Sequence, residues 1–213
     1  RYKFSEAVED KVVLDLIYEA RDIDQRLGSE DKIDAWFDAK TGGLNNWQKD
    51  ELKKKWGTMQ KVLSSKDRMQ KIVTDIAFDF TTKLRLSNER GNAILVAKSI
   101  YEACRYYTLF NTKEAGFKGK CAVITSYNPN ASDVSKEDTG ADTETAKQVI
   151  FDTYTELLKD VSPAPGQSPT KTYEDAAKQQ FINEPVQMKL LVVVDKLLTG
   201  FDAPSCSFLY IDK

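Results

Sequence analysis

Two short apolar runs near the end of the chain constrain its fold more than any other feature. Residues 190–194 read LLVVV and residues 208–211 read FLYI, and an aspartate, Asp195 or Asp212, directly follows each run. Runs without polar alternation are typical of strands that are buried on both faces, as in a parallel sheet covered by helices. We therefore expect an α/β fold in which both runs belong to one mostly parallel sheet.

The segment between the two runs is a candidate binding site. Gly200 and Pro204 predict an irregular loop that carries Thr199 and Asp202. We expect Gly200 at a tight turn, where a β-carbon would clash or force an unsuitable backbone angle. Open α/β sheets bind their ligands in the crevice outside the carboxyl ends of the strands. The alternative is an ordinary connection whose aspartate simply faces solvent.

From residue 91 onward the chain alternates between apolar runs and amphipathic segments. Ser99 and Glu102 have the spacing of a capping box that opens a helix after a strand. The other expected elements are strands at residues 93–97 and 121–125, a mobile polar loop at 131–143, helices at 145–158 and 173–181, and an exposed linker at 161–170. This order favours a right-handed, mostly parallel sheet flanked by helices.

The first ninety residues predict a mainly helical segment that precedes this sheet. Residues 23–63 are polar and helical in tendency, with a break at 41–43 (TGG), and residues 12–18 are a candidate strand. Apolar residues recur at three- and four-residue spacing from Met69 to Leu84. That spacing predicts an amphipathic helix of about five turns with Ser64 or Ser65 as its cap. We expect domains at residues 1–90 and 91–213.

Composition excludes several kinds of site. The chain has no histidine, which removes the commonest general base and metal ligand. Its cysteines, Cys104, Cys121 and Cys206, are odd in number and lie in apolar contexts, which favours reduced core thiols in a cytoplasmic protein. No apolar run approaches the length of a membrane span, and the sequence shows no signal-peptide pattern. We predict no catalytic residue, no metal site and no membrane partner.

The loop residues carry a resemblance to a known family. LLTGFDAP at residues 197–204, followed by LYIDK at 209–213, resembles motif V of the R (motor and restriction) subunit of type I restriction enzymes. That subunit is a superfamily 2 helicase-like DNA translocase. Asp195, Gly200, Asp202 and Pro204 fit the wider superfamily pattern, whereas Thr199 stands where the RNA-helicase branch carries arginine. The departure argues against an RNA helicase.

The resemblance implies an identity for each part of the chain. Residues 91–213 would be the second RecA-like domain of the motor, ending before motif VI. Residues 1–90 would be the segment between the two lobes, since AVED at 7–10 and YEAR at 18–21 resemble the stretch after the family's first motor domain. AILVAKSIYEACRYY, at 93–107, resembles motif IV.

The resemblance also implies roles for individual residues. Asp202 would reach toward the nucleotide ribose or the partner lobe, and Thr199 and Gly200 would line the DNA backbone. Ser99, and the Thr125–Ser126 pair at the end of the second strand, would bind backbone phosphates through hydroxyl and amide groups. A plain helix cap and a plain turn formed by a threonine hydroxyl are the alternatives for these positions.

Ligands and partners follow from the same resemblance. ATP and Mg²⁺ would bind between this domain and the first RecA-like lobe of the full-length subunit, and the partners would be duplex DNA and the methylation and specificity subunits. The chain has no G-x-x-x-x-G-K-[ST] phosphate-binding sequence and no nuclease motif. Alone, it is therefore expected to bind no cofactor, hydrolyse no ATP and cut no DNA. The alternatives are a non-catalytic RecA-like module that binds nucleic acid or protein, and a different superfamily 2 translocase.

The charge of the chain predicts how strongly it binds DNA by itself. Its formal net charge is -2, so no overall field attracts a polyanion. We expect a dissociation constant for duplex DNA on the order of 10⁻⁴ M or weaker at physiological salt. Fluorescence titration of a labelled duplex measures this constant. Tight binding that resists added salt would favour the non-catalytic interaction module instead.

Overall fold

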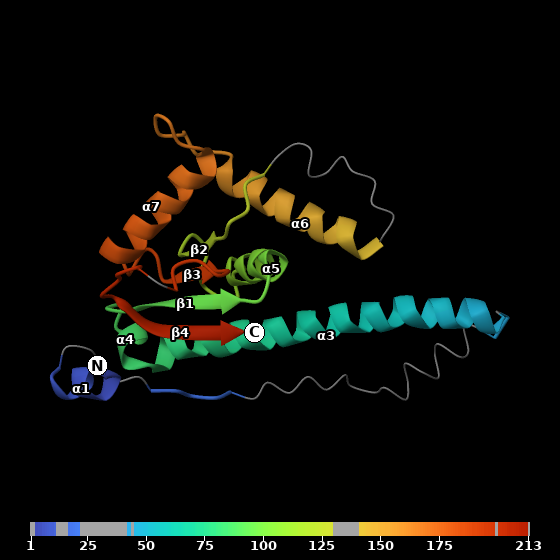
Figure 1. Cartoon of the computed structure of the whole chain (residues 1–213), viewed down its shortest axis with the longest axis horizontal. Coiled ribbons are helices and arrows are strands. Elements are labelled where there is room, and N and C mark those ends of the chain that lie inside the picture. Colours follow the sequence, from blue (N-terminus) through green and yellow to red (C-terminus); the bar gives the residue numbers. More distant parts are fainter. Residues whose placement is uncertain are drawn as a thin grey trace. The chain divides into compact units, whose positions relative to one another are not determined.

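A computed structural model of the chain describes residues 3–11, 17–21, 42–43, 45–129, 141–198 and 200–212 (Figure 1). The chain divides into two compact units, Arg1–Ser64 and Ser65–Lys213. The second unit contains the sheet and every described candidate site residue. The domain boundary at residue 90 stays a prediction, although residues 65–90 belong to the same compact unit as the sheet.

The first unit contains α1 (Phe4–Glu9) and the beginning of α3 (Asn46–Thr82). The α3 helix starts with a reciprocal pair of hydrogen bonds, because Asn45 Oδ1 accepts from the Gln48 amide at 2.8 Å and Gln48 Oε1 accepts from the Asn45 amide at 3.2 Å. This pair follows the predicted break at TGG. Of the candidate strand, residues 12–16 lie outside the described residues, and Ile17 and Tyr18 belong to no helix or strand.

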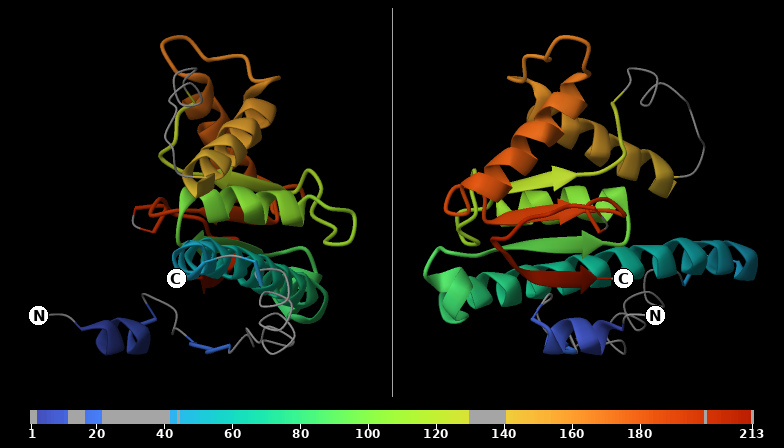
Figure 2. Two further views of the ribbon diagram at one scale, coloured as in Figure 1. Left: turned by 90° about the vertical axis from the view of Figure 1, so that its right-hand side faces the viewer. Right: turned by 60° about the vertical axis from the view of Figure 1, so that its left-hand side comes forward.

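The second unit is built on four parallel strands in the order β2-β3-β1-β4. Val96 of β1 lies opposite Val193 of β3 and Ile211 of β4, and Ile124 of β2 also lies opposite Val193. The strands are β1 (Asn92–Ala97), β2 (Cys121–Ile124), β3 (Leu190–Val193) and β4 (Cys206–Asp212). The right-hand view of Figure 2 shows their arrows pointing the same way. The expected α/β fold with a mostly parallel, RecA-like sheet is confirmed.

Helices cover this sheet on both faces. Ala177 and Phe181 of α7 pack on one face, against Ile94, Leu191 and their neighbours in the strands. The other face meets α5 and the last part of α3, since Tyr106 and Arg68 both bond to Asp212 of β4. The helices of this unit besides α3 are α4 (Leu84–Ser87), α5 (Ile100–Phe110), α6 (Ala141–Leu158) and α7 (Pro169–Asn183).

Several predicted helix boundaries are wrong. The cap at Ser64 or Ser65 does not exist, because both serines lie inside α3. The lysines, glutamines and leucines before them are good helix formers and let the helix continue. The α6 helix begins at Ala141, so residues 141–143 are not a loop, and residues 131–140 lie outside the described residues. The linker after α6 ends at Ser168, whose hydroxyl caps α7 ahead of a proline.

The expectation that both apolar runs are buried on both faces holds for β3 but is wrong for β4. All four residues of β3 are buried. In β4, by contrast, Leu209 and Ile211 expose 54% and 65% of their surface. Side chains alternate along a strand, so Tyr210 points to the α3 side and its two neighbours point away from it. This strand forms one edge of the described sheet, and α7 packs over β1, β2 and β3.

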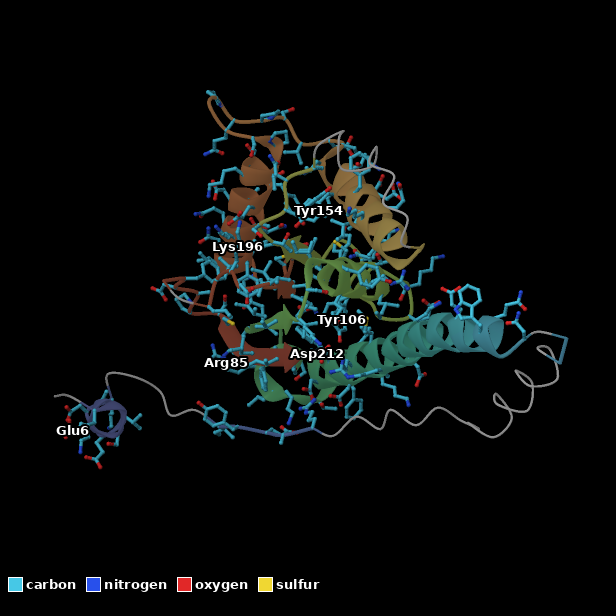
Figure 3. All side chains as sticks on the ribbon, turned by 45° about the vertical axis from the view of Figure 1, so that its right-hand side comes forward. Glu6, Arg85, Tyr106, Tyr154, Lys196 and Asp212 are labelled. Atoms are coloured by element: carbon cyan, nitrogen blue, oxygen red, sulfur yellow. The ribbon has the colours of Figure 1, made fainter. Side chains whose placement is uncertain are left out.

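The carboxylate of Asp212, which is buried at the end of β4, joins three elements. Arg68 of α3 forms a two-pronged ion pair with it, one hydrogen bond of which is 3.0 Å long. The hydroxyl of Tyr106 on α5 donates to the same carboxylate at 2.5 Å (Figure 3). Burial raises the pKa of the Tyr106 phenol, which keeps it protonated as a donor. A second contact, from Tyr210 to Asp79 at 2.8 Å, also joins β4 to α3.

The three cysteines form no disulfide, and Cys206 is only half-buried, unlike the core position expected for it. Cys104 and Cys121 are buried in the second unit, and burial raises the pKa of the Cys104 thiol to about 12. Such thiols are protonated and packed, and they are inert toward oxidants near neutral pH. Among the described helices, none combines the length and the apolar character that a bilayer crossing demands.

Removal of the Asp212 carboxylate should destabilise the fold strongly. Asp212→Ala leaves Arg68 and Tyr106 without their acceptor, and we expect a loss of about 3 kcal/mol in the free energy of unfolding, measured by urea denaturation and circular dichroism. Asp67→Ala is the matched control, because Asp67 pairs with Lys71 on the surface of α3 and such pairs contribute less than about 1 kcal/mol. Equal losses for the two variants would contradict this account.

Candidate functional site

The candidate site residues gather at one edge of the sheet, where the parallel strands end. Ser99 follows β1, Thr125 and Ser126 follow β2, and the loop with Gly200 and Asp202 follows β3. Because the four strands are parallel and in register, their carboxyl ends share this edge. The structure thus brings together residues that are far apart in sequence. Thr199 lies outside the described residues.

Ser99 caps the helix that follows β1. Its backbone is extended (φ -146°, ψ 162°), and its hydroxyl accepts a hydrogen bond from the Glu102 amide at 3.2 Å. The Ser99 half of the predicted capping box is therefore confirmed. One oxygen of the Glu102 carboxylate is buried without a hydrogen-bond partner among the described residues. The contact between Ser99 and a DNA phosphate stays a prediction.

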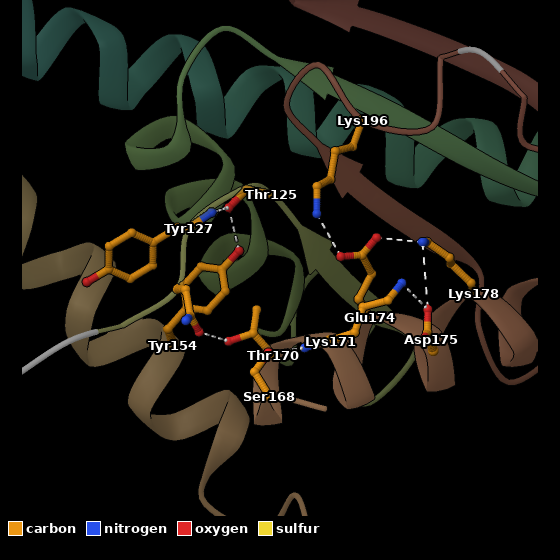
Figure 4. Close-up of polar contacts among 11 residues, drawn as sticks. Thr125, Tyr127, Tyr154, Ser168, Thr170, Lys171, Glu174, Asp175, Lys178 and Lys196 are labelled. Carbon is orange, nitrogen blue, oxygen red and sulfur yellow. Dashed lines mark hydrogen bonds and ion pairs between the residues drawn. The ribbon is translucent and has the colours of Figure 1, made fainter. Parts of the chain in front are cut away.

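Thr125 and Ser126 differ in what their hydroxyl groups can reach. The Thr125 hydroxyl is buried, shares a 2.6 Å hydrogen bond with the Tyr154 hydroxyl of α6, and accepts from the Tyr127 amide at 3.1 Å (Figure 4). Burial raises the pKa of the Tyr154 phenol, so the pair stays neutral. This is the turn formed by a threonine hydroxyl that we gave as the alternative. Ser126 is exposed, and its hydroxyl is the accessible one of the pair.

The loop after β3 has an unusual backbone. The Lys196 amide donates to the Val194 carbonyl at 2.7 Å, which closes a three-residue turn. Asp195 (φ 53°), Leu197 (φ 63°) and Gly200 (φ 70°) all have left-handed backbone angles. For residues with a side chain this conformation costs about 1–2 kcal/mol each. Such strain persists only where other contacts compensate it, and it is common at functional sites.

Both apolar and charged contacts hold this loop. Leu197, Phe201 and Ala203 pack against the core cluster beneath α7, and the rings of Phe201 and Phe181 lie 6.1 Å apart. The ammonium group of Lys196 donates to the Glu174 carboxylate at 2.7 Å. These contacts restrain the described residues of the loop.

The side of the loop that faces solvent carries the candidate residues. Gly200 and Asp202 are exposed, while Phe201 between them is half-buried. An exposed carboxylate accepts hydrogen bonds from hydroxyl or amide groups and attracts cations. Within the described ranges no group of three or more acidic or thiol side chains gathers into a metal site. The Asp202 carboxylate is thus accessible to a ligand, and the roles of Gly200 and Asp202 stay predictions.

Glu174 is a residue of this region that sequence reasoning missed. Burial would raise the pKa of its carboxyl, but hydrogen bonds from Lys178 and Lys196 outweigh that effect and hold the pKa below its usual range. The spacing of Glu174 and Lys178 on one helix was visible in the sequence as an i,i+4 pair. The contact with Lys196 joins residues 22 positions apart and follows only from the tertiary fold.

Comparisons with known proteins match different parts of the chain to two family descriptions. Residues 89–213, more than half of the chain, match the family described as type I restriction enzyme subunit R domain 3. Residues 1–50 match the family described as SWI2/SNF2 ATPase. A Methanocaldococcus jannaschii protein named "Putative type I restriction enzyme MjaIXP endonuclease subunit" is 27% identical over 214 residues. That match covers 100% of this chain but only 17% of the relative's own length.

The backbone of Gly200 yields a prediction. Apart from Gly200 and its two chain neighbours, no atom of the described residues lies within 4 Å of the position that a β-carbon would take, so the expected clash is absent there and the backbone angle is what disfavours a side chain. We expect Gly200→Ala to lower the free energy of unfolding by about 1 kcal/mol. Gly200→Asn should lower it less, because asparagine enters the left-handed region more readily. Urea denaturation measures both, and an alanine variant as stable as the parent would contradict the assigned conformation.

Proposed function

The chain belongs to the family of domain 3 of the type I restriction enzyme R subunit, and from this premise we propose that it is part of an ATP-dependent DNA translocase motor. The observation that carries the proposal is the loop after β3, whose described residues are held by apolar and charged contacts. Its LTGFDAP sequence lies at the carboxyl edge of a parallel sheet, and Asp202 faces solvent there. In the longer polypeptide, this motor would drive duplex DNA translocation and the cleavage that follows it.

Duplex DNA is the proposed substrate of this edge. The exposed hydroxyl of Ser126, with Ser99, Thr199 and the amide of Gly200, would contact backbone phosphates, which position a protein on DNA without reading its sequence. Thr125 would act indirectly, because its buried hydroxyl holds the turn that carries Ser126. The negative net charge fits a domain that shares its DNA contacts with other parts of a larger assembly.

The residues of this chain fit only one side of a nucleotide site. Asp202 offers exposed carboxylate oxygens that suit the hydroxyls of a ribose. The chain has no glycine-rich phosphate cradle, and its described residues hold no acidic cluster for Mg²⁺. ATP and Mg²⁺, which supply the phosphoryl-transfer chemistry when bound, would therefore be held mainly by the first RecA-like lobe of the longer polypeptide.

The proposed mechanism is coupling through one loop. The loop after β3 would meet the nucleotide through Asp202 and the DNA backbone through Thr199 and Gly200. Closure of the two lobes around ATP would shift this loop, and its contact with DNA would turn closure into a step along the duplex. The methylation and specificity subunits of a restriction complex are the proposed protein partners. They would choose the site at which the motor starts.

A non-catalytic module that binds nucleic acid or protein is the second candidate. Its support is the exposed apolar pair Leu209 and Ile211 on β4, which gives the sheet an edge suited to a partner. Another superfamily 2 translocase is the remaining alternative. A motor requires helicase motifs I to III and motif VI elsewhere in the longer polypeptide. The gene sequence on either side of this segment therefore distinguishes the motor from the non-catalytic module.

Asp202→Ala in the longer polypeptide tests the coupling role directly. The side chain is exposed, so the fold should remain intact by circular dichroism. We expect DNA-stimulated ATP hydrolysis to fall at least tenfold, which corresponds to roughly 1.4 kcal/mol of barrier, and translocation to stop. Asp160→Ala, at an exposed turn after α6, is the control and should keep the parent rate. A folded Asp202→Ala variant that translocates at the parent rate would refute the role of this loop.

A further inference from the structure

We propose that Lys196 and Glu174 form a latch that fixes the loop after β3 in the shape that presents Asp202. Glu174 lies on α7 and Lys196 in the loop, and the ammonium nitrogen is 2.7 Å from the carboxylate oxygen Oε2 (Figure 4). Both would be positioning residues of the motor, and this role rests on the proposed function. The effect of the latch on the loop can be tested independently of the proposed function.

Glu174 already has a charged partner within its own helix, α7. Lys178, one turn further along α7, donates to Oε1 at 2.5 Å, so it pairs with one carboxylate oxygen and leaves Oε2 for Lys196. The side chain of Glu174 is only 10% exposed. A buried carboxylate needs a partner to remain charged, and Lys178 supplies one from within the helix. The helix therefore does not require Lys196, and the contact with Lys196 serves the loop.

Lys196 lies between two loop residues whose backbone conformation is strained. Its neighbours on both sides, Asp195 and Leu197, have left-handed backbone angles, which cost about 1–2 kcal/mol each. Without compensating contacts the chain would relax to ordinary angles. A half-buried ion pair at the residue between them opposes that relaxation, because the strained turn aims the lysine at Glu174.

The latch also defines the position of Asp202. Lys196 is tied to α7 at the start of the loop, and Phe201 packs against Phe181 of the same helix directly before Asp202. The described loop residues before and after position 199 are thus held to α7. Loss of the Lys196 contact would leave the first part held by the packing of Leu197, so this part would open more often and Asp202 would sample other positions relative to the sheet.

Asp175 provides a matched control on the same helix. It is the next residue after Glu174 and carries the same charge, but its main partner, Lys171 at 2.8 Å, belongs to α7 itself. Its carboxylate makes no described contact with the loop after β3. Asp175→Asn therefore removes a negative charge from α7 and leaves the latch intact.

Hydrogen–deuterium exchange on the 213-residue chain tests the latch. We expect Lys196→Met and Glu174→Gln to speed amide exchange in residues 195–203 about tenfold, while the amides of β1 keep their protection. Lys196→Arg retains the charge and should restore slow exchange, and Asp175→Asn should match the parent. Unchanged exchange in Lys196→Met, or equal acceleration by Asp175→Asn, would overturn the latch.

DNA-stimulated ATP hydrolysis by the longer polypeptide tests the positioning role separately. We expect Lys196→Met to lower kcat several-fold and Lys196→Arg to restore it. If Asp202→Ala lowers the rate but Lys196→Met does not, the latch does not position Asp202 and this inference fails. If Asp202→Ala itself has no effect, the proposed function fails, and the exchange experiment alone decides whether the latch exists.

Discussion

Asp212 is the last residue of β4, and its carboxylate accepts hydrogen bonds from Arg68 of α3 and Tyr106 of α5. A buried charge is unfavourable unless every oxygen finds a partner, so this contact is satisfied only when both helices pack on the same face of the sheet. The covering of that face by α3 and α5 thus depends in part on one side chain. Asp212 also lies at the carboxyl edge of the sheet, the edge on which the candidate site lies.

The loop after β3 lies at the same edge of the sheet but is held by other contacts. Its strained turn at Asp195 and Leu197 is held by apolar packing beneath α7 and by the charged contact to Glu174. The sheet is rigid because its strands are buried and paired, whereas the loop keeps its shape through a few separate contacts. A nucleotide or DNA that competed with one of these contacts would shift the loop without disturbing the sheet. This difference in rigidity is what a coupling element requires.

Features set by local sequence were predictable, and those that depend on distant partners were not. The apolar run at β3 and the cap at Ser99 were found because burial pattern and capping chemistry act over a few residues. The position of the loop at the carboxyl edge followed from the parallel sheet. The exposed face of β4 was missed, since an apolar run does not reveal that its strand lies at an edge. The pairing of Lys196 with Glu174 was missed because nothing local joins α7 to the loop.

The central claim is that one loop, residues 195–203, meets both nucleotide and DNA. The most direct measurement is a footprint of the unaltered longer polypeptide by hydrogen–deuterium exchange, with a non-hydrolysable ATP analogue, with duplex DNA, and with both. The account predicts slower exchange in this loop with each ligand and the slowest exchange with both. Protection by both ligands elsewhere in the polypeptide, with exchange in residues 195–203 unchanged, would contradict it.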